Sequence, residues 1–577
     1  MKSRKRKQQV SPAGPLPDGR GSVGEYNVWQ GAAVGLAALA VVLLAYGPAL
    51  NGPFVFDDQA LPFFSPGYAE QPLHLAIKGV RPLLYFSFWL NSRLAGTEPY
   101  TYHLFNLLFH FADSLLVFFI ARKILEWAGS VGGRREWLAA FAGAVFLLHP
   151  VQTEAVSYVA SRSETLSALF FYSAFALFLY RKSAVVSWRV TFGVLVLYLA
   201  AASTKEHTVT LPALLLLTDY FWNPGFSFQG IRRNWRLYGT LVVAGAAGAV
   251  LLLTTLRGST SAGFGLKGLP WYDYFYTQWR ALWVYFRLFV LPFGQNADYD
   301  YPISRGVLEH GAILGLAGLL LLTGCAVYYR KRWPVASYGF LGALILFAPT
   351  SSVVPILDAV TERRLYLPMA VLVLILVEFM RAWRVRRAVL AGTAVAALIV
   401  LAFLCYRRNG VWADDVALWE DTVAQSPHNS RAQFQLGVAY FQRGRCDAAA
   451  RQYERAFRVG KPDERLLVDW ALAEDCLNRP EQALDKLRQA AAIRPTAEVY
   501  ANTGMIFGKQ KQYAEALAAL NKALELDARF DMAYFFRGNV YSGLEEFAKA
   551  AEDYQRAVAI NPANDAARRG LARVRPR

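Results

Sequence analysis

Long apolar stretches alternate with short polar segments over the first two thirds of this chain. Such stretches occupy residues 29–49, 103–124, 137–149, 164–180, 189–202, 208–221, 236–255, 310–329, 335–349, 366–381 and 388–406. A helix that crosses a bilayer needs about 20 mostly apolar residues. Several stretches are shorter, so a helix that spans the bilayer there must include neighbouring polar residues, or the stretch must lie inside a bundle. The pattern predicts an all-α protein that begins with a polytopic transmembrane helix bundle of about 11 spans.

Clusters of Lys and Arg follow every second apolar stretch. After the KSRKRK segment near the N-terminus, they lie within residues 122–135, 181–189, 232–236, 330–332 and 381–387. Short basic loops remain in the cytoplasm, which predicts a cytoplasmic N-terminus. The alternation holds only if the aromatic segment 271–292 does not cross. We therefore expect an interfacial or re-entrant helix there, and a tail that emerges on the side opposite the cytoplasm.

Composition and charge agree with a membrane protein. Of the 577 residues, 55% are hydrophobic and 18% are charged, and the net charge is +18. The basic residues are spread through short loops, which argues against a nucleic-acid partner. No A-x-A-like cleavage site follows the first apolar stretch, so we interpret that stretch as an uncleaved span. The predicted domains are a basic tail at 1–28, a membrane region at 29–406, a connecting half-repeat at 407–429 and repeats at 430–577.

The C-terminal region has a period of about 34 residues. One set of alanines is separated by 34, 33 and 34 residues, and a second set repeats seven residues upstream. The two sets are Ala456, Ala490, Ala523 and Ala557, and Ala449, Ala483, Ala516 and Ala550. This period is typical of the tetratricopeptide repeat, a helix-turn-helix unit that stacks into an α-solenoid. Such a solenoid offers a groove for a protein or peptide.

The four cysteines divide between the two regions. Cys325 and Cys405 lie in apolar stretches, whereas Cys446 and Cys476 lie in the repeats. Cys446 begins the second helix of one repeat and Cys476 ends the first helix of the next, so both lie on one edge of the stacked hairpins. In an oxidising compartment this position predicts a disulfide, against the alternative of two small buried hydrophobic residues.

Ionisable residues gather in the loops on the side opposite the basic clusters. They are Asp57, Asp58, Arg81, His149, Glu154, Arg162, Glu164, Lys205, Glu206, Glu362, Arg363 and Arg364, followed by Tyr366. Carboxylates there can orient or deprotonate a hydroxyl, and Arg or Lys can hold a phosphate. Taken singly, each has a structural alternative: an Asp can cap a helix, an Arg can reach lipid headgroups, and Lys205 can pair with Glu206 at the interface.

The sequence lacks the motifs that are typical of several other kinds of site. The histidines do not have the H-E-x-x-H spacing of a zinc site. Neither a G-x-x-x-x-G-K-[ST] loop nor a dinucleotide-binding fingerprint is present, and GFGLKG at 263–268 does not follow a predicted strand. These absences disfavour chemistry driven by a nucleotide.

Several motifs, taken in order along the chain, resemble one family. They are FVFDD, RPLLYFSFWLN, YTYHLFNLLFHF, HPVQTEAVSYVASRSETLSALFF, STKEHTVTLPALLLLTDY and TERRLYLP, followed by the repeats. This order is similar to that of the membrane and tetratricopeptide-repeat O-mannosyltransferases, in the C-type (GT-C) superfamily of membrane glycosyltransferases. Where eukaryotic members tend to have FVHDD, this chain has Phe56 in place of the histidine.

The resemblance implies a polyprenyl-phosphate sugar as donor and an acidic residue of the first outer loop as a catalytic group. Carried over by motif, the catalytic candidates are Asp58, Asp57 and Glu154. The candidates for the donor phosphate are Arg81, Arg162, Lys205, Arg363 and Arg364, with Glu164, Glu206, His149, Glu362 and Tyr366 in support. Relatives differ in whether they need a divalent metal such as Mg²⁺ or Mn²⁺, and the sequence leaves this open.

The function that we predict is transfer of a sugar, mannose in the family, from a polyprenyl-phosphate carrier to a protein or glycan acceptor. The alternatives are a non-enzymatic scaffold and a transporter; the inverted repeats of a transporter are not found. Adjacent residues of a regular element point apart, so we expect Asp58 to face the site and Asp57 to cap the next helix. Asp58, Glu154, Lys205 and Arg363 should surround one cavity open to the membrane and the repeats.

Overall fold

A computed structural model describes residues 28–256, 261–461 and 463–574 of the chain. The basic tail predicted for residues 1–28 lies outside the described residues, apart from its last position. Within the described residues the chain forms helices and no strand, and its only β-bridge is an isolated one between Ala262 and Ile356. The prediction of an all-α protein is confirmed.

Contacts divide the chain into two units, one that ends at Asp414 and one that begins at Asp415. The α-helices of the first unit are α1 (Val28–Tyr46), α2 (Leu73–Ala76), α3 (Pro82–Ala95), α4 (Pro99–Trp127), α5 (Gly132–Leu148), α6 (Thr153–Ser157), α7 (Arg162–Leu179), α8 (Trp188–Ala202), α9 (Leu211–Trp222), α10 (Gln229–Arg233), α11 (Trp235–Leu256), α12 (Trp271–Val290), α13 (Ala312–Tyr329), α14 (Pro334–Phe347), α15 (Tyr366–Ala382) and α16 (Arg387–Trp412). The last of these continues past residue 406, where the membrane region is predicted to end.

The number of helices able to span a membrane differs from the prediction. Among the described residues, five are long and apolar enough: Gly31–Asn51, Pro99–Trp127, Glu309–Tyr329, Glu362–Ala382 and Arg387–Trp412. A sixth results if Gly132–Leu148 and Pro150–Ser157, which are bent by 48°, form one span. The prediction of about 11 spans is therefore wrong by this criterion. Some expected spans are short helices, such as α9 with 12 residues, which reaches only about 18 Å.

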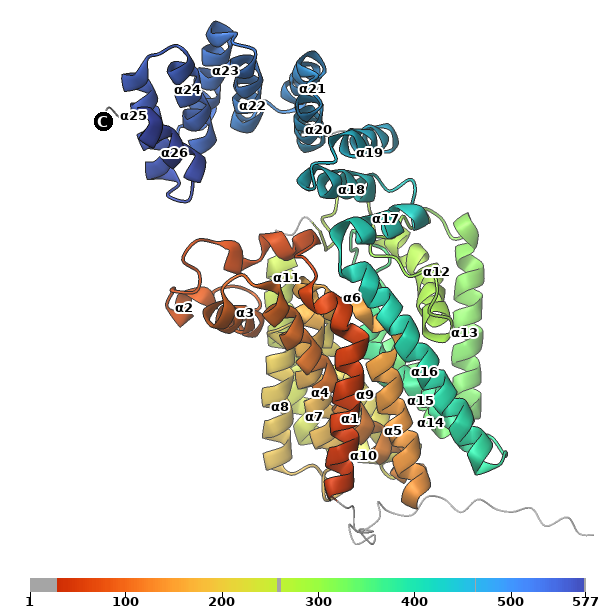
Figure 1. Cartoon of the computed structure of the whole chain (residues 1–577). Helices are drawn as coiled ribbons and strands as arrows, with labels where there is room; N and C mark the ends of the chain where they lie inside the picture. Colours follow the sequence, from red (N-terminus) through yellow and green to blue (C-terminus); the bar gives the residue numbers. More distant parts are fainter. Residues whose placement is uncertain (1–27, 257–260, 462, 575–577) are drawn as a thin grey trace, which may run out of the picture. The chain divides into compact units, whose positions relative to one another are not determined.

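The core of the first unit surrounds α15. This helix is apolar on nearly all sides, and 72% of its apolar window is buried. It packs against α14 and α5, while α4 packs against α5 and α7 (Figure 1). A helix that is hydrophobic all round belongs in an interior, which explains its central position.

The aromatic segment predicted at 271–292 forms α12. Polar residues of α12 are buried against neighbouring loops: Gln278 donates to the Ala359 carbonyl at 3.0 Å, and Thr277 accepts from the Ser304 amide at 2.8 Å. These bonds anchor α12 to the protein. Its position relative to a bilayer stays a prediction.

The second unit consists of stacked helical hairpins. Its helices are α17 (Asp415–Gln425), α18 (Ser430–Gln442), α19 (Cys446–Val459), α20 (Glu464–Cys476), α21 (Pro480–Ile493), α22 (Ala497–Lys509), α23 (Tyr513–Leu526), α24 (Asp531–Gly543), α25 (Phe547–Ile560) and α26 (Asp565–Val574). All eight alanines of the two periodic sets have no exposed surface. Only a small side chain fits where the helices of a hairpin approach this closely. The prediction of a tetratricopeptide-type solenoid in this region is confirmed.

A glycine and a tyrosine determine how closely the hairpins pack. A Cβ atom added to Gly437 would lie 2.5 Å from the ring of Tyr453. The same contact recurs in the last repeat, where a Cβ on Gly538 would lie 2.8 Å from the ring of Tyr554. The small residue and the aromatic ring are thus complementary across each of these hairpins, as the repeat pattern predicts.

The predicted disulfide is present. Cys446 and Cys476 are bonded, and their Cα atoms lie 6.2 Å apart. The bond joins the start of α19 to the end of α20, and therefore links two consecutive repeats. Cys325 and Cys405 are free thiols.

Removing this disulfide should destabilise the repeats. The two cysteines are 30 residues apart in sequence, and closing a loop of that size stabilises a fold by about 2–4 kcal/mol. We expect the double substitution Cys446→Ser/Cys476→Ser to lower the melting temperature of the full chain, measured by circular dichroism without reductant. Cys325→Ser is the matched control and should leave it unchanged. Equal melting temperatures for the two variants would contradict the prediction.

Candidate functional site

Asp58 is a buried anchor of the loop that follows α1. It lies in the 3₁₀ turn η2 (Phe56–Ala60), and its side chain has no exposed surface. Its Oδ2 accepts from the Val55 amide at 3.0 Å, and its Oδ1 accepts from the Ala160 amide at 2.6 Å. Burial raises the pKa of Asp58 to about 8, although the backbone N–H groups lower it. Because Asp58 is buried and each of its oxygens accepts a backbone N–H, an acceptor hydroxyl does not reach it from solvent.

Asp57, the neighbour of Asp58, is exposed. Its backbone N–H donates to the hydroxyl of Tyr158 at 3.0 Å. Phe56 precedes it with a φ of 50°, a left-handed conformation uncommon outside glycine. Asp58 therefore fixes the turn, and Asp57 is the accessible aspartate.

Glu154 and Arg363 form the first of three ion pairs at this end of the bundle. Glu154, on α6, accepts from Arg363 Nη1 at 2.5 Å and from the Arg363 backbone N–H at 3.0 Å. Its side chain is 3% exposed, whereas that of Arg363 is 26% exposed. The guanidinium also lies 5.9 Å from the centroid of the Tyr158 ring, which connects this pair to the Asp57 backbone.

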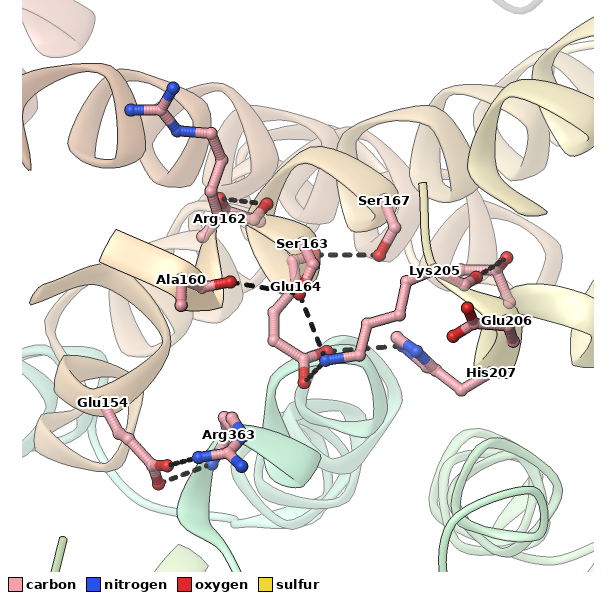
Figure 2. Close-up of polar contacts among 12 residues, drawn as sticks. Glu154, Ala160, Arg162, Ser163, Glu164, Ser167, Lys205, Glu206, His207 and Arg363 are labelled. Carbon is pink, nitrogen blue, oxygen red and sulfur yellow. Dashed lines mark hydrogen bonds and ion pairs between the residues drawn. The ribbon is translucent and has the colours of Figure 1, made fainter. Parts of the chain in front are cut away.

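The second ion pair joins the start of α7 to the segment after α8. Lys205 Nζ donates to Glu164 Oε1 and, at 3.3 Å, to the hydroxyl of Ser163. His207 Nε2 lies 3.6 Å from the other oxygen of Glu164. Figure 2 shows Lys205 and His207 directed toward the same carboxylate.

The third ion pair is bidentate. Arg81, just before α3, donates from Nε and Nη2 to the two oxygens of Glu206 at 2.9 and 2.8 Å. Glu206 opens the 3₁₀ turn η6 (Glu206–Thr210), directly after Lys205. The second and third pairs are therefore adjacent in the chain.

These pairs form one electrostatic unit. Burial lowers the pKa of Lys205 and Glu164 raises it, while Arg81 and Arg363 lower it further. Arg81 and Arg363 therefore each lie close enough to repel Lys205, and the carboxylates hold the three cations together. We call the following residues the ion-pair cluster: Arg81, Glu154, Glu164, Lys205, Glu206, His207 and Arg363. Of the four residues expected to converge, Glu154, Lys205 and Arg363 do so. Asp58 lies in the buried turn instead, and the backbone of Asp57 is joined to Arg363 through Tyr158.

Arg162 does not belong to this cluster, contrary to the prediction. It is fully buried and donates to Asn106 Oδ1 at 2.7 Å and Asn91 Oδ1 at 2.8 Å. Its guanidinium also lies 4.6 Å from the centroid of the Phe88 ring. In Figure 2 its side chain points away from Glu164. Arg162 joins α7 to α3 and α4, and a fully buried, hydrogen-bonded guanidinium cannot reach a lipid phosphate.

Glu362 and Arg364 lie on either side of Arg363 in the sequence. Their side chains form hydrogen bonds with neighbouring loops rather than with the ion-pair cluster. Glu362 is buried and accepts from the Asn296 amide at 2.6 Å and the Tyr299 hydroxyl at 2.8 Å. Arg364 donates to the Asp358 carbonyl at 2.5 Å. Arg364 therefore holds the loop before it, and its role in binding the donor phosphate stays a prediction.

His149 and Tyr366 are also structural. His149 donates from Nε2 to the Phe289 carbonyl at 3.0 Å. Tyr366 is buried in the bundle, where its hydroxyl donates to Asp113 Oδ2 at 2.8 Å and lies 2.9 Å from His110 Nδ1. In these positions both residues stabilise helix packing, and a role in supporting the site stays a prediction.

Tyr158 and His207 lie at the site but were not among the predicted site residues. Tyr158 has the more central position. It bridges the Asp57 backbone and the Arg363 side chain. Its position four residues after Glu154, in a loop rich in polar residues, was the available signal. In the described part of the chain no group of three or more His, Cys, Asp or Glu side chains is arranged to hold a metal ion, so no ligand set is assigned.

The described residues form a helix bundle, with helices apolar and long enough to span a membrane, and a separate repeat region. Several similar proteins carry the same name. A protein O-mannosyl-transferase of Caenorhabditis elegans is 25% identical, over 74% of this chain and 62% of the relative. The protein O-mannosyl-transferases TMTC3 of Mus musculus and TMTC4 of Homo sapiens are 23% and 25% identical, over 91% and 72% of this chain and 64% of each relative. The chain spans just under two thirds of the length of these relatives.

The repeats match family models in their own right. Tetratricopeptide-repeat models match residues 406–464, 497–530 and 532–564. Among solved structures, the tetratricopeptide-repeat protein YrrB is 21% identical, with a TM-score of 0.24, over 32% of this chain and 92% of that protein.

Loss of the Asp58 side chain should destabilise the protein more than loss of the Asp57 side chain. Asp58→Ala leaves the amides of Val55 and Ala160 without acceptors, which costs about 1–3 kcal/mol for each buried group. Asp57→Ala removes an exposed side chain and should change stability by no more than about 0.5 kcal/mol. Thermal unfolding of both variants in detergent tests this, and an equal or larger loss for Asp57→Ala would refute it.

Stability should also depend on pH through Asp58. Its pKa is raised to about 8 in the fold, against about 3.9 in an unfolded chain. Between these two pH values Asp58 keeps a proton in the folded protein that it loses in the unfolded chain. The stabilisation of the fold by this proton is fully present below about pH 4 and is lost as the pH rises through about 8. We expect the melting temperature to fall from pH 5 to pH 8 in the natural protein and to fall less in Asp58→Asn. Parallel pH profiles would contradict this.

Proposed function

We propose that this chain is a membrane glycosyltransferase that moves a sugar from a polyprenyl-phosphate carrier to a hydroxyl group of a protein acceptor. The names of the relatives support transfer of mannose to protein. The carrier lipid follows from the chemistry expected of the ion-pair cluster and from the resemblance of the sequence motifs.

The observation that carries the proposal is the convergence of three cations in one cluster of ion pairs, which Tyr158 connects to the backbone of the exposed Asp57. Arg81, Lys205 and Arg363 come from three separate segments, and their side chains are 36%, 17% and 26% exposed. A purely structural set of ion pairs has no need to gather two arginines that each repel Lys205. An anionic ligand would relieve that repulsion.

The two arginines keep hydrogen-bond donors beyond those that their carboxylates accept. A guanidinium carries five N–H groups. Arg81 donates to Glu206 from Nε and Nη2, and the Arg363 side chain donates to Glu154 from Nη1. The remaining N–H groups can donate to phosphate oxygens while the carboxylates hold both arginines in place. Such preorganised donors stabilise the charge that develops on a leaving phosphate.

Asp57 is the proposed general base. The acceptor oxygen attacks C1 of the sugar, the bond between C1 and the phosphate oxygen breaks, and the acceptor proton passes to the Asp57 carboxylate. The polyprenyl phosphate leaves with the electron pair of the broken bond, next to Arg363 and Lys205. Tyr158 positions Asp57 by holding its backbone N–H.

We place this reaction on the non-cytoplasmic face of a bacterial inner membrane, with the N-terminus in the cytoplasm and the repeats in the periplasm. Two features support this arrangement: the alternating basic segments, which favour cytoplasmic loops, and the Cys446–Cys476 disulfide, since such bonds persist in oxidising compartments.

Asp57→Asn should abolish transfer without affecting folding. Loss of a general base lowers a rate by about 10²–10⁴-fold. In cells that lack the gene, expression of the natural protein should restore hexose on Ser- and Thr-containing peptides of envelope proteins, as measured by mass spectrometry, and Asp57→Asn should not. Glu70→Gln, at an exposed carboxylate of the same loop, is the matched control and should restore it.

Two results would count against the proposal. Full restoration by Asp57→Asn would exclude Asp57 as the base. Identical glycopeptides with and without the gene would oppose a protein glycosyltransferase and favour a scaffold.

A further inference from the structure

Exposed cations gather at the end of the helix bundle that is opposite the ion-pair cluster. We call the following residues the basic patch: Lys182, Arg189, Arg232, Arg233 and Arg236. Helix α8 runs from Trp188, next to Arg189, to Ala202, three residues before Lys205 of the ion-pair cluster. Figure 1 shows α10, which carries two of the arginines, at the end of the bundle away from α6. The basic patch therefore lies outside the proposed reaction site.

No carboxylate balances the basic patch. The two segments that carry it, residues 181–190 after Arg181 and residues 223–236, contain no Asp or Glu. Within the described residues none of the patch side chains forms an ion pair or a hydrogen bond. The basic segment at the end of α4 differs, because Arg122 pairs with Glu136 and Lys123 pairs with Glu126. The patch thus keeps a positive charge that the protein neutralises elsewhere.

A buried network holds the two segments of the patch together. Asp219, at the end of α9, has no exposed surface. Its carboxylate accepts from Arg181 Nη2 at 2.7 Å, Asn234 Nδ2 at 2.7 Å and the Tyr238 hydroxyl at 2.8 Å. Asn234 in turn accepts from the Val186 amide at 2.8 Å. The segment before α8 is therefore fixed against the start of α11, and the cations of both segments form one surface.

Two indole rings lie beside the cations. The guanidinium of Arg236 is 5.5 Å from the centroid of the Trp188 ring and 5.8 Å from that of the Trp235 ring. Trp188 begins α8 and Trp235 begins α11, and their side chains are 58% and 64% exposed. Tryptophan is enriched at membrane–water interfaces, since its ring is apolar and carries one N–H donor. The patch therefore has the composition of an interfacial surface.

An exposed apolar stripe continues from Trp188 along α8. Its members are spaced three or four residues apart and so share one face of the helix. They are Phe192, Val196 and Leu199. Helix α11 packs against α8 and exposes Val242 and Val243. Cations and indoles thus lie at one end of a face that is apolar along its length.

We infer that the basic patch binds an anionic phospholipid, with the headgroup phosphate at Arg236 and an acyl chain along the stripe that begins at Phe192. Charge complementarity argues for this occupant, because guanidinium groups without carboxylate partners bind phosphate oxygens through charge-assisted hydrogen bonds. Basic sites between helices at a membrane surface bind anionic headgroups in this way. A soluble anion would match the cations but leave the apolar stripe without a partner. The inference goes beyond the proposed sugar transfer and does not depend on it.

Native mass spectrometry of the full chain tests the inference. The protein is purified in detergent and mixed with equal amounts of phosphatidylglycerol and phosphatidylcholine that have the same acyl chains. We expect the complex with the anionic lipid to be at least tenfold more abundant than the complex with the zwitterionic lipid. Glycerol phosphate, which carries the headgroup charge without acyl chains, should not displace the bound lipid at tenfold excess.

Substitutions locate the binding. Arg189→Gln/Arg236→Gln removes one cation from each segment of the patch and should lower the abundance of the complex with phosphatidylglycerol at least fivefold. Lys331→Gln/Arg332→Gln is the matched control, because it removes two exposed cations from another basic segment, and it should change the abundance less than twofold. Melting temperatures equal to that of the natural protein show that both variants are folded.

Three results would overturn the inference. One is equal retention of the two lipids by the natural protein. Another is an equal loss of phosphatidylglycerol in the two double variants, which would assign its retention to the net charge of the protein rather than to the patch. The third is displacement of the lipid by glycerol phosphate, which would assign the patch to a soluble phosphate compound.

Discussion

Charges at the edge of an apolar bundle must be paired, and this requirement determines both the fold and the candidate site. Each carboxylate of the cluster joins segments far apart in sequence. Glu154 and Arg363 are 209 residues apart, Arg81 and Glu206 are 125 apart, and Glu164 and Lys205 are 41 apart. Removing one partner of a buried pair costs several kcal/mol, because the other charge is left uncompensated. The loops at this end of the bundle therefore hold their positions through the groups that the proposed chemistry needs.

The two aspartates after α1 lie in the same turn but have different environments: one stabilises the fold, and the other stays accessible for chemistry. Asp58 loses its water contacts, binds two backbone amides and has a raised pKa. Asp57 keeps its side chain in solvent while its amide is held by Tyr158. The left-handed conformation of Phe56 accompanies this arrangement. Rigid support and an accessible carboxyl group thus come from adjacent residues.

The sequence predicts the features that depend on periodicity and misses those that depend on local geometry. A 34-residue period places the alanines, the hairpins and the Cys446–Cys476 disulfide, because each repeat has the same geometry. The loop residues have no such period. Arg162 and Arg363 both follow Glu154 in polar motifs, yet Arg162 turns into the protein among Asn91 and Asn106. Hydropathy likewise locates apolar stretches but overestimates the spans, since several stretches form helices too short to cross a bilayer alone.

The most direct test of the account is a structure of the full chain, by electron cryo-microscopy, with a short-chain polyprenyl-phosphate mannose bound. The account predicts the phosphate within hydrogen-bond distance, about 3 Å, of Arg363 and Lys205, with C1 of the sugar facing Asp57 and away from the lipid chain. A phosphate bound elsewhere in the bundle, with the ion-pair cluster unchanged and empty of ligand, would contradict it.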